Sequence, residues 1–349
     1  MKKIFLIVLL GILALPSCRN TVEPISDCPL WYPIYGPDII PIEPAPKGNP
    51  IIHGVSRDGN KLAFNGPLGF QILDLKTGYM QTFISEYFNN KLPPNVIFYG
   101  GENVYWCPYD NNRLLLKIAT FTDTIGDGKR YEYGQNLYIM SIDGKEFKKI
   151  TPISFGPLGE DCCIISWLEG SSLNEDLILF CGRDIYIPQK DQWIPKPIDG
   201  HIYSVSPDNK YYFYSVDIGD FKEKPVLNGV DLKFADNIGQ ITHESWSRDS
   251  KKLVLSVYVN EPNVAPEKKR YDEIWIIDVE KVLRERPAIT PVSIINIRQR
   301  FCMYSYNMGA EFITDSTLAV SMWRPDEDYG FIYEISTKGD MIRQLTFTP

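Results

Sequence analysis

Histidine and clustered basic residues are both scarce in this sequence. There are 3 histidines among 349 residues, and the longest basic cluster is Lys268-Lys269-Arg270. The net charge of −8 at pH 7 also argues against a nucleic-acid partner, because neutralising a phosphate backbone requires a basic face. We therefore expect no nucleic-acid binding.

Motifs of the common enzyme classes are absent. The sequence contains no Gly-x-Ser-x-Gly elbow, no His-Glu-x-x-His and no glycine-rich phosphate-binding run. A Cys-x-x-Cys pair, the usual sign of a cysteine-bound zinc, is also missing. These absences favour a non-catalytic protein, and no cofactor is expected apart from the metal hypothesis considered below.

Apolar runs of membrane-spanning length are missing too. The longest run, residues 4–15, follows Lys2 and Lys3 and is too short for a mature transmembrane helix, so it is typical of a secretion signal. Any membrane attachment should therefore come through a lipid at the N-terminus only. The chain is expected outside the cytoplasm, at the outer membrane or cell envelope, facing the periplasm or the exterior.

The apolar run ends in Leu15-Pro16-Ser17-Cys18. This stretch resembles the lipobox of bacterial lipoproteins, although Pro16 departs from the small residue usual there. The resemblance implies a signal peptide over residues 1–17 and lipidation of Cys18. A plain secretory signal cut near Ser17 would explain the same pattern.

Six cysteines follow Cys18, an even number for an oxidising compartment. They are Cys28, Cys107, Cys162, Cys163, Cys181 and Cys302. Disulfides are allowed, and their pairing stays open. Cys163 and Cys181 lie at equal distances from a predicted turn near Ser172, so they could face each other across a hairpin.

A repeated unit dominates the remaining sequence. Its core is a polar Ser-x-Asp turn followed by an apolar strand, with clear copies at 56–64, 206–213 and 247–255 and weaker ones at 107–116, 167–180 and 312–320. A second hairpin signal follows, as at 71–78 and 137–144, so each unit holds about four strands. Six such units predict an all-β fold, a six-bladed β-propeller of four-stranded antiparallel blades over residues 51–349.

These units resemble the WD40-like repeats of the TolB propeller family. The resemblance rests on Val205-Ser206-Pro207-Asp208, Trp246-Ser247-Arg248-Asp249, Lys149-Ile150-Thr151-Pro152 and the terminal Gln344-Leu345-Thr346. It implies the propeller fold but no activity, because such repeats occur in proteins of unrelated function. Residues 18–50 stand apart as a lipidated tether and proline-rich extended segment, which packs on the propeller or adds a strand at 39–42 to its last blade.

The three histidines occupy comparable places in their units. His53, His201 and His243 precede Asp58, Asp208 and Asp249, and we expect them just before the first strand of a blade, near the central channel. Three imidazoles there could hold a transition metal. The alternative is that they are ordinary channel-rim or loop histidines bonded to the backbone.

Two long connections, 120–133 and 260–272, suggest a recognition rim. Its aromatic anchors would be Tyr131, Tyr133 and Tyr271, while Arg298 and Arg300, expected on a strand, could bind carboxylates or acidic sugars. Exposed polar loops and alternating charges are otherwise simply solvated.

Three hypotheses follow. The first is a non-catalytic binding module for an envelope protein or glycan, and the second is a metal-assisted carbohydrate-active enzyme acting on acidic polysaccharides through the channel face. The third is a sensor or assembly scaffold like the TolB proteins, which rests on the resemblance alone.

Overall fold

The computed structural model describes most of the chain after residue 49. The described residues are 50–107, 110–123, 131–155, 162–167, 177–181, 184–187, 192–195, 200–208, 210–217, 223–232, 238–260, 270–285, 291–301, 303, 309–323 and 330–346. The predicted leader, 1–17, and all but Pro50 of the predicted extended segment, 18–50, lie outside them.

The strands pair into six four-stranded antiparallel sheets, each built from consecutive strands. The first two sheets hold β1 (Ile51–Val55), β2 (Lys61–Gly66), β3 (Gly69–Asp74), β4 (Met80–Phe83), β5 (Val96–Trp106), β6 (Arg113–Asp123), β7 (Tyr131–Ser141) and β8 (Phe147–Phe155). The next two hold β9 (Cys162–Trp167), β10 (Leu177–Cys181), β11 (Asp184–Ile187), β12 (Gln192–Pro195), β13 (His201–Val205), β14 (Tyr212–Asp217), β15 (Glu223–Leu227) and β16 (Val230–Asp231). The last two hold β17 (Ile238–Trp246), β18 (Lys252–Asn260), β19 (Arg270–Asp278), β20 (Ser293–Asn296), β21 (Ala310–Thr314), β22 (Thr317–Met322), β23 (Phe331–Ser336) and β24 (Met341–Gln344).

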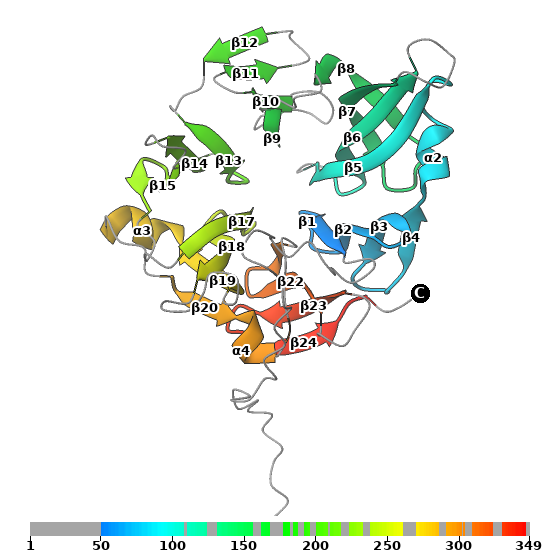
Figure 1. Ribbon diagram of the computed structural model, residues 1–349. Coiled ribbons are helices and arrows are strands. Elements are labelled where there is room, and N and C mark those ends of the chain that lie inside the picture. The colour runs from blue at the N-terminus through cyan, green and yellow to red at the C-terminus, as the bar shows by residue number, and fades with distance from the viewer. Residues whose placement is uncertain are drawn as a thin grey trace, which may run out of the picture.

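The sheets stand around a common centre, with the first strand of each sheet innermost (Figure 1). Contacts between these inner strands link β5, β1, β21, β17, β13 and β9 in that order. The last sheet therefore lies beside the first, through β21 and β1. The prediction of an all-β propeller with four-stranded antiparallel blades is confirmed.

The Ser-x-Asp turns form because their side chains satisfy their own backbone. The Ser56 hydroxyl donates to Asp58 at 2.6 Å and accepts the Lys61 N–H at 2.9 Å. Ser247 does the same with Asp249 and Lys252, at 2.7 and 2.8 Å. The prediction that these motifs are local turn chemistry is confirmed.

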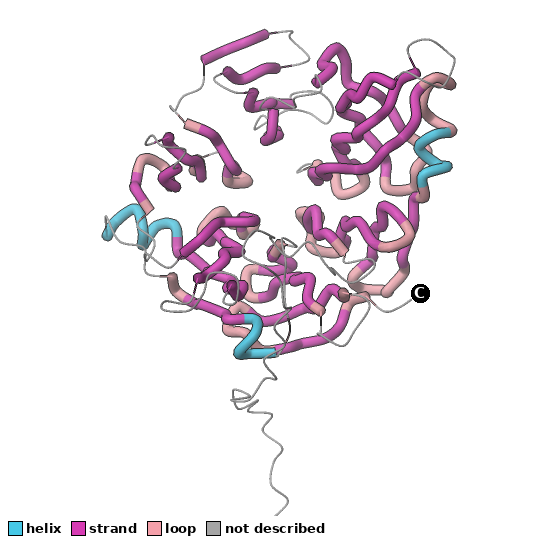
Figure 2. Tube along the Cα trace, viewed as in Figure 1, coloured by secondary structure: helices cyan, strands magenta, loops and turns pink. Residues whose placement is uncertain are grey.

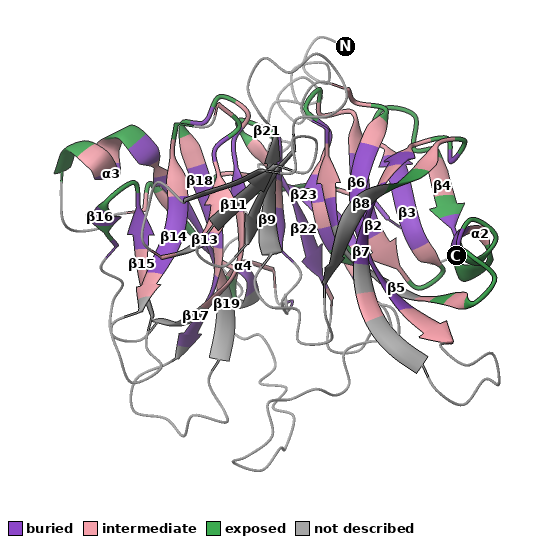
Figure 3. Ribbon diagram, turned by 90° about the horizontal axis from the view of Figure 1, so that it is seen from above, coloured by how far each residue is buried: buried purple, intermediate pink, exposed green. Residues whose placement is uncertain are grey.

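Because strands alternate in direction, these turns lie at one end of the sheets. We call the end that joins first and second strands the turn end, and the opposite one, which joins second and third strands, the loop end. Figure 3 shows the two ends from the side, with buried residues concentrated in the strands between them. The loop end carries the connections between β6 and β7 and between β18 and β19.

Apolar side chains fill the spaces between neighbouring sheets. Leu227 and Leu255, for example, belong to one buried cluster shared by the fourth and fifth sheets. Tryptophans before two turns also join sheets: Trp106 Nε1–H donates to the Gly54 carbonyl at 2.9 Å, and Trp246 Nε1–H to Ser204 Oγ at 3.0 Å. The aromatic position of the repeat thus binds each of these sheets to the one before it.

Three short helices lie on the outside of the ring in the described residues (Figure 2). They are α2 (Ser85–Asn89), α3 (Val279–Glu285) and α4 (Ile297–Phe301). No helix in the described part of the chain is long and apolar enough to cross a membrane.

The hairpin expected around residue 172 is present as β9 and β10. Its register, however, pairs Cys181 with Cys162, not with Cys163. The prediction from equal spacing was wrong because a β-bulge between Phe180 and Cys181 shifts the register by one residue. Cys107 is buried.

Candidate functional site

All three histidines belong to innermost strands. His53 lies in β1, His201 begins β13 and His243 lies in β17. The sequence analysis expected them just before these strands, whereas the structure places them within the strands. Their convergence on a central channel stays a prediction, and the side chain of His201 is outside the described part of the structure.

His243 takes part in a polar cluster that spans two sheets. Its Nε2 lies 2.8 Å from Oε1 of Glu311 on β21, and Ser245 Oγ donates to the other carboxylate oxygen at 2.6 Å. The His243 and Glu311 side chains are 24% and 13% exposed, so both are largely buried. Gly309 makes room for the ring, because a Cβ there would lie 2.9 Å from His243 Nε2.

The charges of this cluster are strongly coupled. Burial opposes protonation of His243, but the hydrogen bond and negative charge of Glu311 outweigh it and raise the pKa of His243 above its ordinary value. Burial raises the pKa of the adjacent Glu244 to about 7, with Glu311 adding to the rise and His243 opposing it. The pairing with Glu311 thus favours the protonated form of His243, and Glu244 lies close to its midpoint near neutral pH.

His53 is the opposite case. Burial lowers its pKa to about 4, the charge of His243 adds to that effect, and a hydrogen bond with the Asn65 side chain opposes it. His53 is the extra residue of a β-bulge between Ile52 and Gly54, which turns its side chain out of the regular alternation. Its Nε2 is buried and has no hydrogen-bond partner among the described residues.

This arrangement combines a hydrogen-bonded histidine and carboxylate, a second histidine with a lowered pKa, and a carboxyl group with a pKa of about 7. We name His53, His243, Glu244, Ser245 and Glu311 the channel cluster. It can offer a hydrogen bond to a ligand at His53 Nε2 and exchange a proton at Glu244.

Metal binding by this region stays a prediction. Within the described ranges, no three histidine, cysteine, aspartate or glutamate side chains are placed to hold one metal ion. The three-histidine hypothesis also requires His201, whose side chain is not among those described.

The sequence analysis missed Glu311 and Glu244. A usable signal was present, because Glu311 is a lone charge between the apolar residues Ala310 and Phe312. Charged residues are rarely placed on inner strands without a partner or a role. Glu244 directly follows His243, one of the three histidines predicted to lie near the channel.

The three predicted rim tyrosines lie at the loop end. Tyr131 begins β7 and pairs with Asp123, Tyr133 follows two residues later, and Tyr271 pairs with Val259 near the start of β19. The connections expected to be long loops are therefore partly strand. Contact of these tyrosines with a partner stays a prediction.

The strand expected for Arg298 and Arg300 was wrong, because both belong to helix α4. The Asn296 side chain accepts the Gln299 N–H at 2.9 Å and so caps the start of this helix. Arg300 donates to the Gly339 carbonyl at 2.7 Å and to Asp340 at 2.9 Å, which joins the fifth and sixth sheets. Recognition of carboxylates by either arginine stays a prediction.

Comparison with known proteins returned structural neighbours only, since no family model and no curated protein sequence matches the chain. TolB from Acinetobacter baumannii is 14% identical, with a TM-score of 0.44, over 84% of this chain and 62% of that one. This chain thus spans less than two thirds of that TolB. A putative TolB from Agrobacterium tumefaciens is 13% identical, with a TM-score of 0.30, over 86% of this chain and 80% of that one.

A hydrazine synthase structure from Kuenenia stuttgartiensis is also similar, at 12% identity and a TM-score of 0.40. The match covers 80% of this chain and 77% of that chain. These neighbours carry different names, so the similarity extends to the propeller fold alone. The site must therefore be interpreted from its own residues.

Proposed function

We propose that this chain is a lipid-tethered binding module of the cell envelope, whose propeller presents its loop end and channel to a protein or glycan partner. The N-terminal sequence supports the tether, with Cys18 as the lipidated residue. The six sheets are proposed to be the six blades of one closed ring. Contact between β1 and β21 supports closure between the first and last blades.

The observation that carries the proposal is the unpartnered Nε2 of His53. Buried polar atoms in native proteins almost always have a hydrogen-bond partner, because an unpaired one costs about 1–3 kcal/mol. Neutral His53 keeps an acceptor or donor available at this position, whichever tautomer it adopts. A hydroxyl or amide group of a bound partner would satisfy it.

The loop end offers the surrounding surface. Strands β5, β6 and β7 have 11 residues each, and β17, β18 and β19 have 9, whereas the corresponding strands of the first sheet have 5 or 6. Two sheets therefore extend further than the first, and their second and third strands meet at the loop end. The predicted aromatic anchors Tyr131, Tyr133 and Tyr271 lie on these extensions.

The proposal is tested by crosslinking the tagged full-length protein in its native envelope and identifying what is captured. We expect a defined protein or glycan, and at least several-fold less of it with His53→Gln. Tyr79→Ala, which changes an exposed side chain at the turn end, is the matched control and should capture as much as the wild type. Cys18→Ala provides the unanchored form.

Equal capture by wild type and His53→Gln would contradict a binding role for the channel. Retention of Cys18→Ala in the membrane fraction would contradict the lipid tether. These two parts of the proposal are thus tested separately.

A second candidate is a metal-assisted enzyme acting on acidic polysaccharides, with His53, His201 and His243 as ligands and Arg298 pairing with a substrate carboxylate. The placement of all three histidines on innermost strands favours it. A transition metal that copurifies with the protein and is lost on His201→Ala would support this candidate. A metal-free protein with a defined partner would favour the binding module.

A further inference from the structure

A small cavity lies between the first and second sheets at the loop end. Its volume is about 200 Å³, and its lining residues carry no charge. Four of the lining residues are phenylalanines: Phe70, Phe83, Phe88 and Phe98. It is separate from the channel cluster, although both adjoin the same residue, Asn65.

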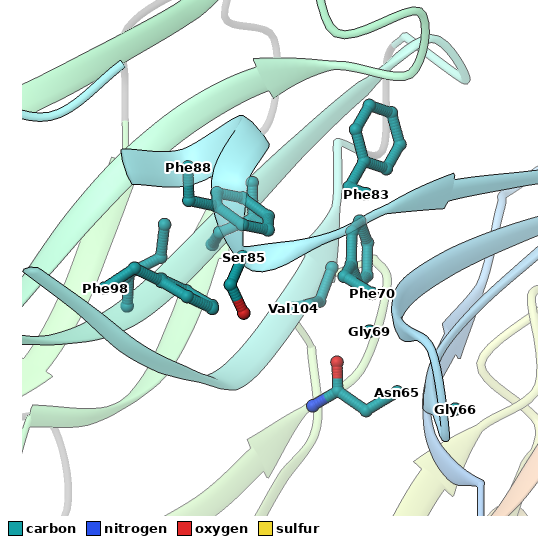
Figure 4. A pocket seen from close by; sticks show the side chains of 11 residues that line it. Asn65, Gly66, Gly69, Phe70, Phe83, Ser85, Phe88, Phe98 and Val104 are labelled. Carbon is teal, nitrogen blue, oxygen red and sulfur yellow. The ribbon is translucent and has the colours of Figure 1, made fainter. Parts of the chain in front are cut away.

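The phenylalanines form two stacked pairs. The ring centroids of Phe70 and Phe83 are 6.0 Å apart, and those of Phe88 and Phe98 are 4.4 Å apart, with interplanar angles of 27° and 18°. In Figure 4 the first pair lies on one side of the cavity and the second pair on the other. The wall therefore offers both faces and edges of aromatic rings to an occupant.

This wall is held in place by contacts outside the cavity. Tyr87, on the helix that carries Phe88, donates its hydroxyl to the Gly144 carbonyl at 2.8 Å. The Tyr87 ring also meets the rings of Phe83 and Phe88 edge-on, with centroids 4.9 and 5.1 Å away. A cavity that is already ordered needs little rearrangement to bind a ligand.

Two polar groups point into the space between the stacked pairs. Figure 4 shows the Ser85 hydroxyl and the Asn65 carboxamide directed into it from opposite sides. Ser85 begins α2 and is exposed, so its hydroxyl marks the mouth of the cavity. An occupant can thus bury an apolar body and still form one hydrogen bond at its edge.

We propose that this cavity binds a single neutral aromatic ring with a hydroxyl or amine at its edge, a ligand of the phenol class. A cavity of about 150 Å³ is known to accommodate benzene, so about 200 Å³ matches one substituted ring. The uncharged lining disfavours ionic ligands, because nothing in it would compensate a desolvated charge. The two stacked pairs favour a ring over a saturated chain of equal volume.

The cavity also adjoins the channel. Asn65 lines it and hydrogen-bonds His53, and the His53 and Phe70 rings have centroids 6.5 Å apart. A bound ring would therefore lie behind the residues that position His53. The NMR signals of the His53 ring should shift when the cavity fills.

The test is a titration of the full-length protein with phenol, benzene and cyclohexanol, followed by saturation-transfer NMR and by the His53 ring signals. We expect phenol to bind with a Kd of about 1 mM or tighter, and cyclohexanol to bind at least about fivefold more weakly. Ser85→Ala should weaken phenol about fivefold while leaving benzene unchanged, because only phenol uses the hydroxyl.

A blocking variant separates this site from nonspecific binding. Ser85→Leu places an apolar side chain across the mouth at an exposed position and should abolish phenol binding. Glu86→Leu, at the next exposed residue of the same helix, is the matched control and should retain it.

Two results would overturn the proposal. One is equal phenol binding by wild type and Ser85→Leu, which would place the ligand elsewhere. The other is no detectable binding of phenol to the wild type.

Discussion

The turn end and the channel cluster use similar polar side chains in different ways. At the turn end, Ser56 and Asp58 form hydrogen bonds with each other and with backbone groups within five residues. The hydroxyls of three further serines, Ser141, Ser206 and Ser247, likewise donate to the aspartate two residues later. In the channel cluster, Glu311 bonds a histidine 68 residues away. Recurrent local bonds shape the turns, whereas a long-range cluster of buried charged groups that does not recur in the repeat points to a function.

The largest expected effect comes from removing the shared carboxylate of the channel cluster. Glu311→Ala leaves both His243 and Ser245 without their partner, so we expect a loss of about 2–4 kcal/mol in the free energy of unfolding. Urea denaturation of the variant and the wild type at pH 7 measures this difference.

The matched control is Glu334→Ala, on β23 of the same sheet. Glu334 is also largely buried, at 10% side-chain exposure, but its partner Arg343 is 50% exposed and can be hydrated when left alone. A smaller loss is therefore expected there. Equal losses in the two variants would mean that the channel cluster is an ordinary ion pair.

The next effect is a pH dependence due to Glu244. Its pKa is about 7 in the folded protein and 4.5 ordinarily, so its contribution to stability is fully present below about pH 4.5 and is lost as the pH rises through 7. Glu244→Gln should remove that loss. The stability of the variant relative to wild type should therefore rise by about 2–3 kcal/mol between pH 5 and pH 8.

Denaturation curves of both proteins at several pH values would measure this difference. Parallel stability profiles would show that Glu244 is not held neutral by the fold.

A smaller effect is expected at the turn end. Ser247→Ala removes a hydroxyl that donates to Asp249 and accepts the Lys252 N–H, so we expect a loss of about 1–2 kcal/mol. Ser316→Ala, in the exposed turn of the last sheet, should cost less than about 0.5 kcal/mol. Both are measured by urea denaturation, and partner capture should be unchanged in both. Lost capture in Ser247→Ala would contradict a purely structural role for the turns.

The architecture was largely predictable from the sequence because its determinants are local. A Ser-x-Asp turn, an apolar strand and a second turn lie within one repeat, and each leaves a visible pattern. Helix α4 was missed for an equally local reason: Asn296 caps it, but the alternation of Arg298 and Arg300 was interpreted as a strand.

The channel cluster was only half predictable. The scarcity of histidine directed attention to His53 and His243, but nothing near them in the sequence indicates Glu311. The contact between His243 and Glu311 depends on sheets five and six lying side by side, and the orientation of His53 depends on a β-bulge. Such contacts are set by the closure of the fold, which no short pattern encodes.

The central claim is that their surroundings shift the pKa values of His53 and His243 in opposite directions. An NMR titration of the histidine ring signals tests it directly, with assignments from single His→Gln variants. We predict a pKa of about 4 for His53 and a value above the ordinary 6.5 for His243. Titration of both rings together near 6.5 would contradict the account.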